Sequence, residues 1–195
     1  KRQIFSDDPY IIHSGTFTEA KDGIMGIIMA FKDAIPKIPL KVKLVITGDA
    51  QNSPLYVDVV NYVSKFKIID RVIFTGVVSD SELQMYLKNA SLAIINKYDN
   101  LQNKYCFSSR LSEYLAYGVP VIITDVGEAK NYLVNNQSAY IVKERDRSEL
   151  SSAIIDAFSD QEKRLIIAKN GMLLAKEIFN YSVQGKRIST FLLSL

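Results

Sequence analysis

The sequence predicts an α/β protein: a Rossmann-like, doubly wound parallel sheet of about six strands with helices on both faces. Three observations predict this class. Short apolar runs alternate with segments of helical spacing at intervals of roughly thirty residues, as in repeated strand–helix units. Most of these runs are continuous, which is typical of strands buried on both faces. Several runs end at a glycine, as tight strand-to-helix turns often do.

Three strand–helix units make up the first half of the chain. Their strands end at, or shortly before, Gly15, Gly48 and Gly76. The helices show apolar residues at helical spacing, and Ser79 with Glu82 forms a capping-box pattern at the start of the third. The expected strands span residues 10–13, 42–48 and 71–76, and the expected helices span residues 24–31, 55–63 and 79–87.

The second half continues this alternation and ends in helices. A polar loop at 96–106 separates a strand at 91–95 from a short helix that begins near Ser108. A Gly-Val-Pro corner then leads into another buried strand. The further elements expected are a strand at 119–123, a short helix near 127–134, a strand near 138–142, helical faces between 147 and 178, and a separate helix at 181–195.

One domain, at 10–180, accounts for most of the chain. A linker at 1–9 leads into it, and the helix at 181–195 follows it. A chain of 195 residues with 48% hydrophobic residues can bury a sizeable core. Because the sequence opens with Lys1 rather than methionine, we expect it to be a piece of a longer protein.

Charge and composition argue against several classes of protein. The formal net charge of +3 is far from the basic stripe of a nucleic-acid-binding protein. No apolar run reaches the ~18 residues that a membrane-spanning helix needs. A single cysteine, Cys106, excludes an internal disulfide and suits a reducing compartment. We therefore expect a cytoplasmic protein, with a peripheral contact at the cytoplasmic face of the inner membrane left open.

Common catalytic and cofactor patterns do not occur. His13 is the only histidine, which rules out a Ser-His-Asp triad within this chain and favours a structural role near a strand end. No cluster has metal-ligand spacing. Neither Gly-x-Gly-x-x-Gly nor a phosphate-loop lysine pattern is found, which argues against dinucleotide dehydrogenases and phosphate-loop NTPases. A receiver domain would need paired acids where Ser14 and Gly15 stand.

The stretch 107–124 carries the strongest chemical signal. Ser108 and Ser109 stand at a helix N-terminus, where N–H groups without helical partners and the helix dipole favour an anion. Arg110 adds a charge beside them, although a cation in the first turn opposes the dipole. Glu113 lies about one turn further and can accept hydrogen bonds from hydroxyl groups. The stretch therefore predicts a phosphate site next to a hydroxyl-binding carboxylate.

The glycines that follow the first three strands add to this site. In parallel sheets ligands bind at the carboxyl ends of the strands, and Gly15, Gly48 and Gly76 all stand there. They can serve tight turns alone, or they can allow a ligand close to the backbone. Lys21 follows Gly15 by six residues and supplies a second cation near the same edge.

Three stretches resemble the C-terminal, donor-binding domain of GT-B fold glycosyltransferases of the large group 1 family (family four). The likeness covers roughly residues 9–180. The most specific stretch, 107–121, resembles a motif of two glutamates separated by seven residues and followed by Ala-x-Gly-x-Pro-Val. The other two are Ser14-Gly15-Thr16-Phe17 with Lys21-Asp22-Gly23, and residues 72–78 with Leu83 and Tyr86.

The chain departs from the family pattern at two positions. Thr16 stands in place of the first-loop arginine, so Lys21 alone remains in that loop to meet a diphosphate. Tyr105 stands in place of the first glutamate, which typically contacts the transferred sugar, while Glu113 matches the second. Some members lack the first glutamate, and residues 108–116 match their variant of the motif.

The resemblance implies how a nucleoside diphosphate sugar would bind. Glu113 would hold the ribose hydroxyls, and N–H groups around Ser108, Ser109 and Arg110 would hold the phosphates. Lys21 and Arg110 are the expected catalytic residues, because they would neutralise the departing diphosphate. The residues expected to contact the donor are Gly15, Thr16, Gly48, Gly76, Val77, Leu83, Tyr105, Phe107, Ser108, Ser109 and Glu113.

The implied activity is transfer of a hexose from a UDP- or GDP-linked donor, with retention, in polysaccharide or glycoconjugate biosynthesis. A missing N-terminal domain would hold a glycan or lipid-linked acceptor, and the helix at 181–195 would cross to it. No tightly bound cofactor or metal is expected, and the fragment alone should transfer nothing. Two alternatives stay open: a nucleotide-sugar 2-epimerase, and a catalytically silent nucleotide-binding or scaffold module, which Thr16 and Tyr105 favour.

Overall fold

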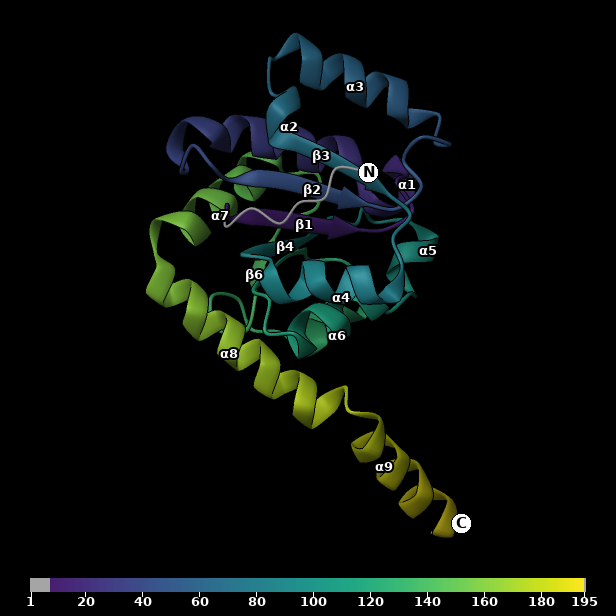
Figure 1. Ribbon diagram of the computed structural model, residues 1–195. Coiled ribbons are helices and arrows are strands. Elements are labelled where there is room, and N and C mark those ends of the chain that lie inside the picture. The colour runs from purple at the N-terminus through teal and green to yellow at the C-terminus, as the bar shows by residue number, and fades with distance from the viewer. Residues whose placement is uncertain (1–7, 195) are drawn as a thin grey trace.

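Six parallel strands form one sheet in the order β3-β2-β1-β4-β5-β6 in the computed structural model, which describes residues 8–194 (Figure 1). This all-parallel arrangement confirms the predicted fold class. The linker expected at 1–9 falls mostly outside the described residues. The strands are β1 Tyr10–Ser14, β2 Lys43–Thr47, β3 Val72–Gly76, β4 Leu92–Ile95, β5 Val121–Thr124 and β6 Tyr140–Val142.

β1 is the strand at which the chain changes direction across the sheet. It pairs with β2 on one side, where Ile11 lies opposite Leu44. On the other side it pairs with β4, where Ile11 lies opposite Leu92. The first three strands therefore extend the sheet one way and the last three the other, so the strand order reverses between β1 and β4.

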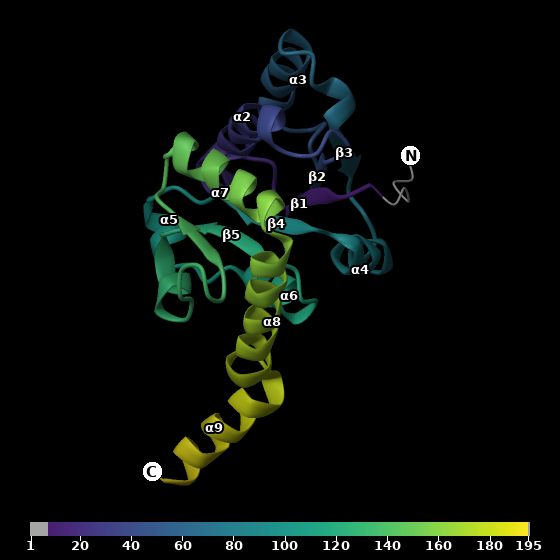
Figure 2. The same ribbon diagram turned by 90° about the vertical axis from the view of Figure 1, so that its left-hand side faces the viewer.

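Two helical layers cover the two faces of the sheet (Figures 1 and 2). Neighbouring strand residues alternate between them: Ile11 faces one core and Ile12 the other. Because both faces are buried, most positions of the strands are apolar, and the polar residues stand near their ends. One layer holds α2 Ile24–Ala34, α3 Leu55–Lys65 and α7 Arg147–Ser159, and the other holds α4 Asp80–Asn89, α6 Ser109–Ala116 and α8 Gln161–Ile178.

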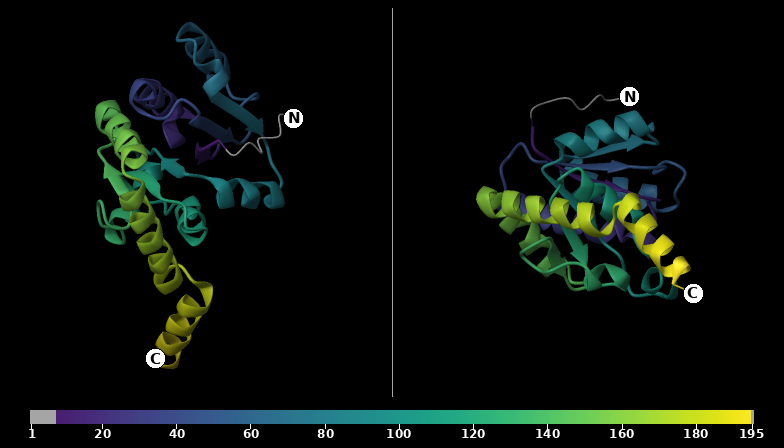
Figure 3. Two further views of the ribbon diagram at one scale, coloured as in Figure 1. Left: turned by 60° about the vertical axis from the view of Figure 1, so that its left-hand side comes forward. Right: turned by 90° about the horizontal axis from the view of Figure 1, so that it is seen from below.

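The C-terminal helix α9, Tyr181–Leu193, continues from α8 and projects away from the sheet (Figure 3). It matches the separate helix expected after residue 180, and none of its described residues is buried. Its crossing to another domain stays a prediction. Within residues 8–194, no helix combines the length and the apolar character that crossing a membrane requires.

The structure differs from the predicted elements mainly in its short helices. α1, Glu19–Asp22, is separate from α2 because Gly23 takes a left-handed conformation (φ 54°) that ends it. The loop expected at 96–106 contains α5, Leu101–Lys104, which Asn100 caps by accepting from the Asn103 N–H group. The remaining short elements are the 3₁₀ turns η1 Ile35–Lys37, η2 Ile69–Arg71 and η3 Gly127–Asn131, the last in place of a helix near 127–134.

Candidate functional site

The expected site lies at the carboxyl edge of the sheet, where the arrowheads point in Figure 1. Gly15 and Gly48 directly follow β1 and β2, and Gly76 ends β3. We use the term switch point for the ends of β1 and β4 together with the residues that follow them, 15–23 and 96–103. In doubly wound sheets, ligands bind where the strand order reverses, and the reversal falls between these two strands.

A buried carboxylate holds the loop that follows β1. The Oδ2 atom of Asp22 accepts one hydrogen bond from the Thr16 N–H group, at 2.8 Å, and another from the Thr16 hydroxyl, at 2.6 Å. Asp22 is only 7% exposed. The residue that stands in place of the family's arginine is therefore engaged by its own loop, and its expected contact with the donor stays a prediction.

Side chains from outside the loop fix it further. Glu19 accepts from the Met25 N–H group at 2.7 Å and from the Tyr98 hydroxyl at 2.8 Å. Asn96, just after β4, donates to the Gly23 carbonyl at 2.8 Å. The loop around Lys21 is thus tied to the residues that follow β4, while the Lys21 side chain stays partly exposed.

Gly15 and Gly48 bring two backbone segments together. Gly48 has φ of 124°, and a Cβ atom added there would lie 2.2 Å from the Gly15 carbonyl oxygen. Its N–H group donates to the carbonyl of Gly76 at 3.0 Å. This packing is a structural reason for the glycine at 48, whereas a Cβ atom at Gly15 would lie 2.9 Å from both Asp22 Oδ2 and His13 Nε2. Whether a ligand also approaches them stays a prediction.

The N-terminus of α6 carries an ion pair. Arg110 Nη1 lies 2.5 Å from Glu113 Oε2, and each side chain is 38% exposed. The Glu113 carboxylate therefore provides an intramolecular reason why a cation is tolerated in the first turn. Ser108 is the N-cap residue, but its hydroxyl makes no capping hydrogen bond, unlike the capping box predicted at Ser79, which is present.

Tyr114 connects α6 to the end of β1. Its hydroxyl accepts from the Ser14 N–H group at 2.9 Å, and the side chain is fully buried. Burial strongly raises the pKa of this hydroxyl, which therefore stays protonated. Because Tyr114 follows Glu113 directly, this bond holds the Arg110–Glu113 pair near the switch point.

The other predicted contact residues lie in different environments. The Phe107 ring packs against Tyr132 and Phe179, with centroids 6.2 and 5.1 Å away. Tyr105 and Val77 are 75% and 71% exposed, and neither has a fixed position in the core. The half-buried side chain of Leu83 packs on the α4 side of the core.

His13 provides a pH-dependent test of the switch point. Its Nδ1 atom lies 2.9 Å from the Ile94 carbonyl oxygen and so donates to it. This leaves Nε2 unprotonated and without a hydrogen-bond partner among the described residues. Burial lowers the pKa of His13, although the charge of Asp22 acts in the opposite direction. The folded chain therefore resists protonation at a pH where the unfolded chain, with a pKa of about 6.5, accepts a proton.

We expect the free energy of unfolding to fall as the pH drops below about 6.5, with a slope of at most ~1.4 kcal/mol per pH unit from this group. The His13→Asn variant keeps an N–H donor for Ile94 but does not titrate, so its slope should be smaller. Urea titrations between pH 5.5 and 7.5 measure both slopes. Parallel profiles for parent and variant would contradict the expectation, because the chain has no other histidine.

Several polar residues of the switch point were not singled out by the sequence. Asp22, Asn96, Lys97 and Asn103 are each at least nine-tenths buried. The position of Asn96 and Lys97 immediately after a buried strand was a usable signal, since that is the edge where ligands bind. Burial of Asp22 and Asn103 depends on packing between distant segments, which no local pattern reveals.

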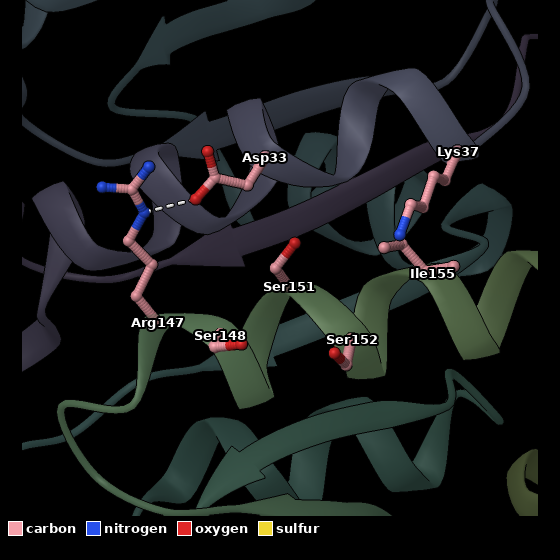
Figure 4. A pocket seen from close by; sticks show the side chains of 7 residues that line it. All are labelled: Asp33, Lys37, Arg147, Ser148, Ser151, Ser152 and Ile155. Carbon is pink, nitrogen blue, oxygen red and sulfur yellow. Dashed lines mark hydrogen bonds and ion pairs between the residues drawn. The ribbon is translucent and has the colours of Figure 1, made fainter.

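One surface pocket lies away from this edge. A pocket of about 450 Å³ lies between α2 and α7, where Arg147 donates a hydrogen bond to Asp33 (Figure 4). None of its lining residues belongs to the expected site. Residues 8–194 contain no cluster of three or more histidine, cysteine, aspartate or glutamate side chains placed to bind a metal.

The fold and the residues at the carboxyl edge of the sheet define a doubly wound α/β domain. Domains of this class bind ligands at the carboxyl ends of their strands. Residues 1–173 match the family described as "Glycosyl transferases group 1", and the chain belongs to that family.

Known proteins with similar sequences and structures agree with this assignment. The chain is 30% identical over 176 residues to alpha-monoglucosyldiacylglycerol synthase of Streptococcus pneumoniae, covering 87% of this chain and 35% of the relative. It is 25% identical over 159 residues to N-acetyl-alpha-D-glucosaminyl L-malate synthase of Bacillus anthracis, covering 82% and 38%. The chain thus spans little more than a third of these curated relatives.

Among solved structures, the chain resembles HepE of Anabaena in complex with UDP. The TM-score is 0.82 at 20% identity, and the match covers 97% of this chain and 50% of HepE. At this identity the likeness concerns the fold, which is that of GT-B glycosyltransferases.

Proposed function

We propose that residues 10–180 form the donor-binding domain of a glycosyltransferase that takes a hexose from a nucleoside diphosphate sugar. One observation supports the proposal. In a chain of this family, the loop after β1, which carries Lys21, and the N-terminus of α6, which carries Arg110 and Glu113, come together. Tyr114 joins these two segments through Ser14. Both segments stand at the carboxyl edge of a doubly wound sheet, where phosphate-bearing ligands bind.

In this proposal each group has a separate task. The N–H groups at the start of α6 hold the phosphates, since a helix N-terminus favours an anion. Glu113 accepts hydrogen bonds from the ribose hydroxyls. Lys21 and Arg110 stabilise the negative charge that develops on the diphosphate as the sugar leaves, which is the most effective place for fixed charges. Ser79 and Leu83, at the start of α4, lie near the nucleobase.

The donor and the remaining protein are further parts of the proposal. UDP is the first nucleotide to test, because the similar structure of HepE is a UDP complex, and GDP is the second. The acceptor, a glycan or a lipid-linked sugar, would be held by another domain, consistent with the share of its relatives that this chain spans. We propose transfer with retention, without a metal, at the cytoplasmic side of the membrane, and no transfer by this chain alone.

Glu113→Ala tests the ribose contact. We expect the affinity for UDP to fall at least ~10-fold, because hydrogen bonds to a charged group contribute about 1.5–3 kcal/mol. The affinity for pyrophosphate should not fall, because the variant keeps Arg110 and removes a negative charge. Titration calorimetry with UDP, GDP, ADP and pyrophosphate measures this. Glu162→Ala is the matched control, since Glu162 is an exposed acid in the first turn of α8 and belongs to none of the expected contacts.

The outcomes separate the donor-binding domain from a catalytically silent module. If the parent binds no nucleotide, or Glu113→Ala binds UDP as the parent does, the donor site is refuted. The silent module is favoured by two observations: Thr16 is engaged by Asp22, and Tyr105, in place of an acid, is 75% exposed. A 2-epimerase has no comparable support, because His13 is buried and no second histidine exists.

A further inference from the structure

Lys97 is a buried lysine at the switch point. It stands two residues after the end of β4, and it is only 7% exposed. Its backbone is fixed on both sides by Thr124 at the end of β5: the Lys97 N–H group donates to the Thr124 hydroxyl at 2.8 Å, and that hydroxyl donates to the Lys97 carbonyl at 2.8 Å. The side chain therefore starts from a rigid position between β1 and β5.

Within residues 8–194, the charge of Lys97 has no counterion. Its ammonium group makes one hydrogen bond, a long one of 3.3 Å to the neutral side-chain oxygen of Asn103. Among the residues that the structure describes, no carboxylate lies within ion-pair distance of it. A buried ammonium without an opposite charge is costly, so such groups are usually paired. The arrangement is that of a cation whose partner comes from outside the chain.

The neighbours of Lys97 link it to the expected phosphate site. His13 faces the same region and is neutral. The charges of Lys97 and Arg110 both contribute to lowering its pKa. Asp22 is the acid that also acts on His13, and its Oδ2 atom accepts from Thr16, but no ion pair joins it to Lys97 among the described residues. Asn103, which contacts Lys97, also donates to the carbonyl of Lys21 at 3.3 Å. Lys97 thus lies among the segments that carry Lys21 and Arg110.

We propose that Lys97 binds the diphosphate of the donor. It supplies the positive charge that is missing from the loop after β1, where the uncharged Thr16 stands in place of the family's arginine. The inference rests on the proposed function, and it adds a buried cation after β4 to the two cations already expected. Because Thr124 fixes the backbone of Lys97 and Asn103 accepts from its ammonium group, the cation is in place before the ligand arrives. It acts on the phosphates and not on the nucleoside.

Lys97→Met removes the charge and keeps an unbranched apolar chain that suits a buried position. We expect at least a tenfold loss of affinity for UDP and for pyrophosphate by calorimetry, and unchanged affinity for uridine. Lys97→Arg should keep at least part of the binding, since the charge is retained. Lys104→Met is the matched control, because Lys104 is an exposed lysine in α5 of the same segment, and it should bind UDP as the parent does.

Folding is checked separately in urea. Without ligand, Lys97→Met should be at least as stable as the parent, because an unpaired buried charge has been removed. If the parent binds UDP and pyrophosphate and Lys97→Met binds both equally well, the role of Lys97 is refuted while the proposed function stands. A matching loss for uridine, or a destabilised variant, would mark Lys97 as a structural residue instead. If the parent binds neither ligand, the proposed function and this inference fall together.

Discussion

The Gly48→Ala variant should lose about 3 kcal/mol or more of its free energy of unfolding. Two costs combine. A side chain at φ of 124° is strained by ~1–3 kcal/mol. The new methyl group would also lie 2.2 Å from the Gly15 carbonyl oxygen, a backbone atom, so the ends of β1 and β2 must move apart. Overpacking of this kind costs a further ~1–3 kcal/mol.

Thermal and urea unfolding measure the loss, which should lower the melting temperature by roughly 6–12 °C in a chain of this size. Gly76→Ala is the matched control. Gly76 also has a positive φ, 73°, but a Cβ atom there meets no atom within 4 Å. Its variant should suffer the conformational strain alone, ~1–2 kcal/mol. Equal losses for the two variants would show that the close approach of Gly48 to Gly15 is unimportant.

The second large effect is expected for Asp22→Ala. Removal of the carboxylate leaves the Thr16 N–H group and hydroxyl without their acceptor, and hydrogen bonds to charged groups contribute ~1.5–3 kcal/mol each. We expect the free energy of unfolding to fall by about 2–4 kcal/mol, with part of the loss recovered by water. Because the same loop carries Lys21, the affinity for UDP should fall too.

Thr16→Ala separates the two bonds. It removes the hydroxyl and keeps the N–H group, so its loss should be about half that of Asp22→Ala. In the double variant the losses should not add, because both residues belong to one contact. Urea denaturation of the three variants gives the coupling energy. Additive losses would mean that Asp22 stabilises the loop through other contacts.

The sheet could be predicted from the sequence because each strand is a local, continuous apolar run. The apolar runs at 42–48 and 71–76 correspond to β2 and β3, whose ends differ from the predicted ends by a residue or two. The short helices α1 and α5 could not be predicted, because neither is long enough to show helical periodicity. α5 begins through a cap by Asn100, whose amide also donates to the carbonyl of Ala20, a contact across 80 residues.

The sequence indicates candidate site residues where a motif carries them, but it does not reveal the contacts that packing creates. Arg110 and Glu113 were identified from their positions on a helix, but their mutual ion pair was not foreseen. Thr16 was expected to contact the donor because it stands in place of a family arginine. Its hydrogen bonds to Asp22 were not foreseen, and the donor contact stays a prediction. Lys97 was missed because a lysine after a strand usually reaches solvent, and only the folded chain shows that it is buried.

The many side-chain bonds to the loop after β1 affect the thermodynamics of association. A flexible loop that becomes ordered around a ligand loses backbone entropy of ~1–2 kcal/mol per residue. Here Glu19, Asp22 and Asn96 have already restricted the loop through contacts within the chain. That entropy is lost during folding and not during association, so the measured affinity for a ligand reflects mainly its contacts.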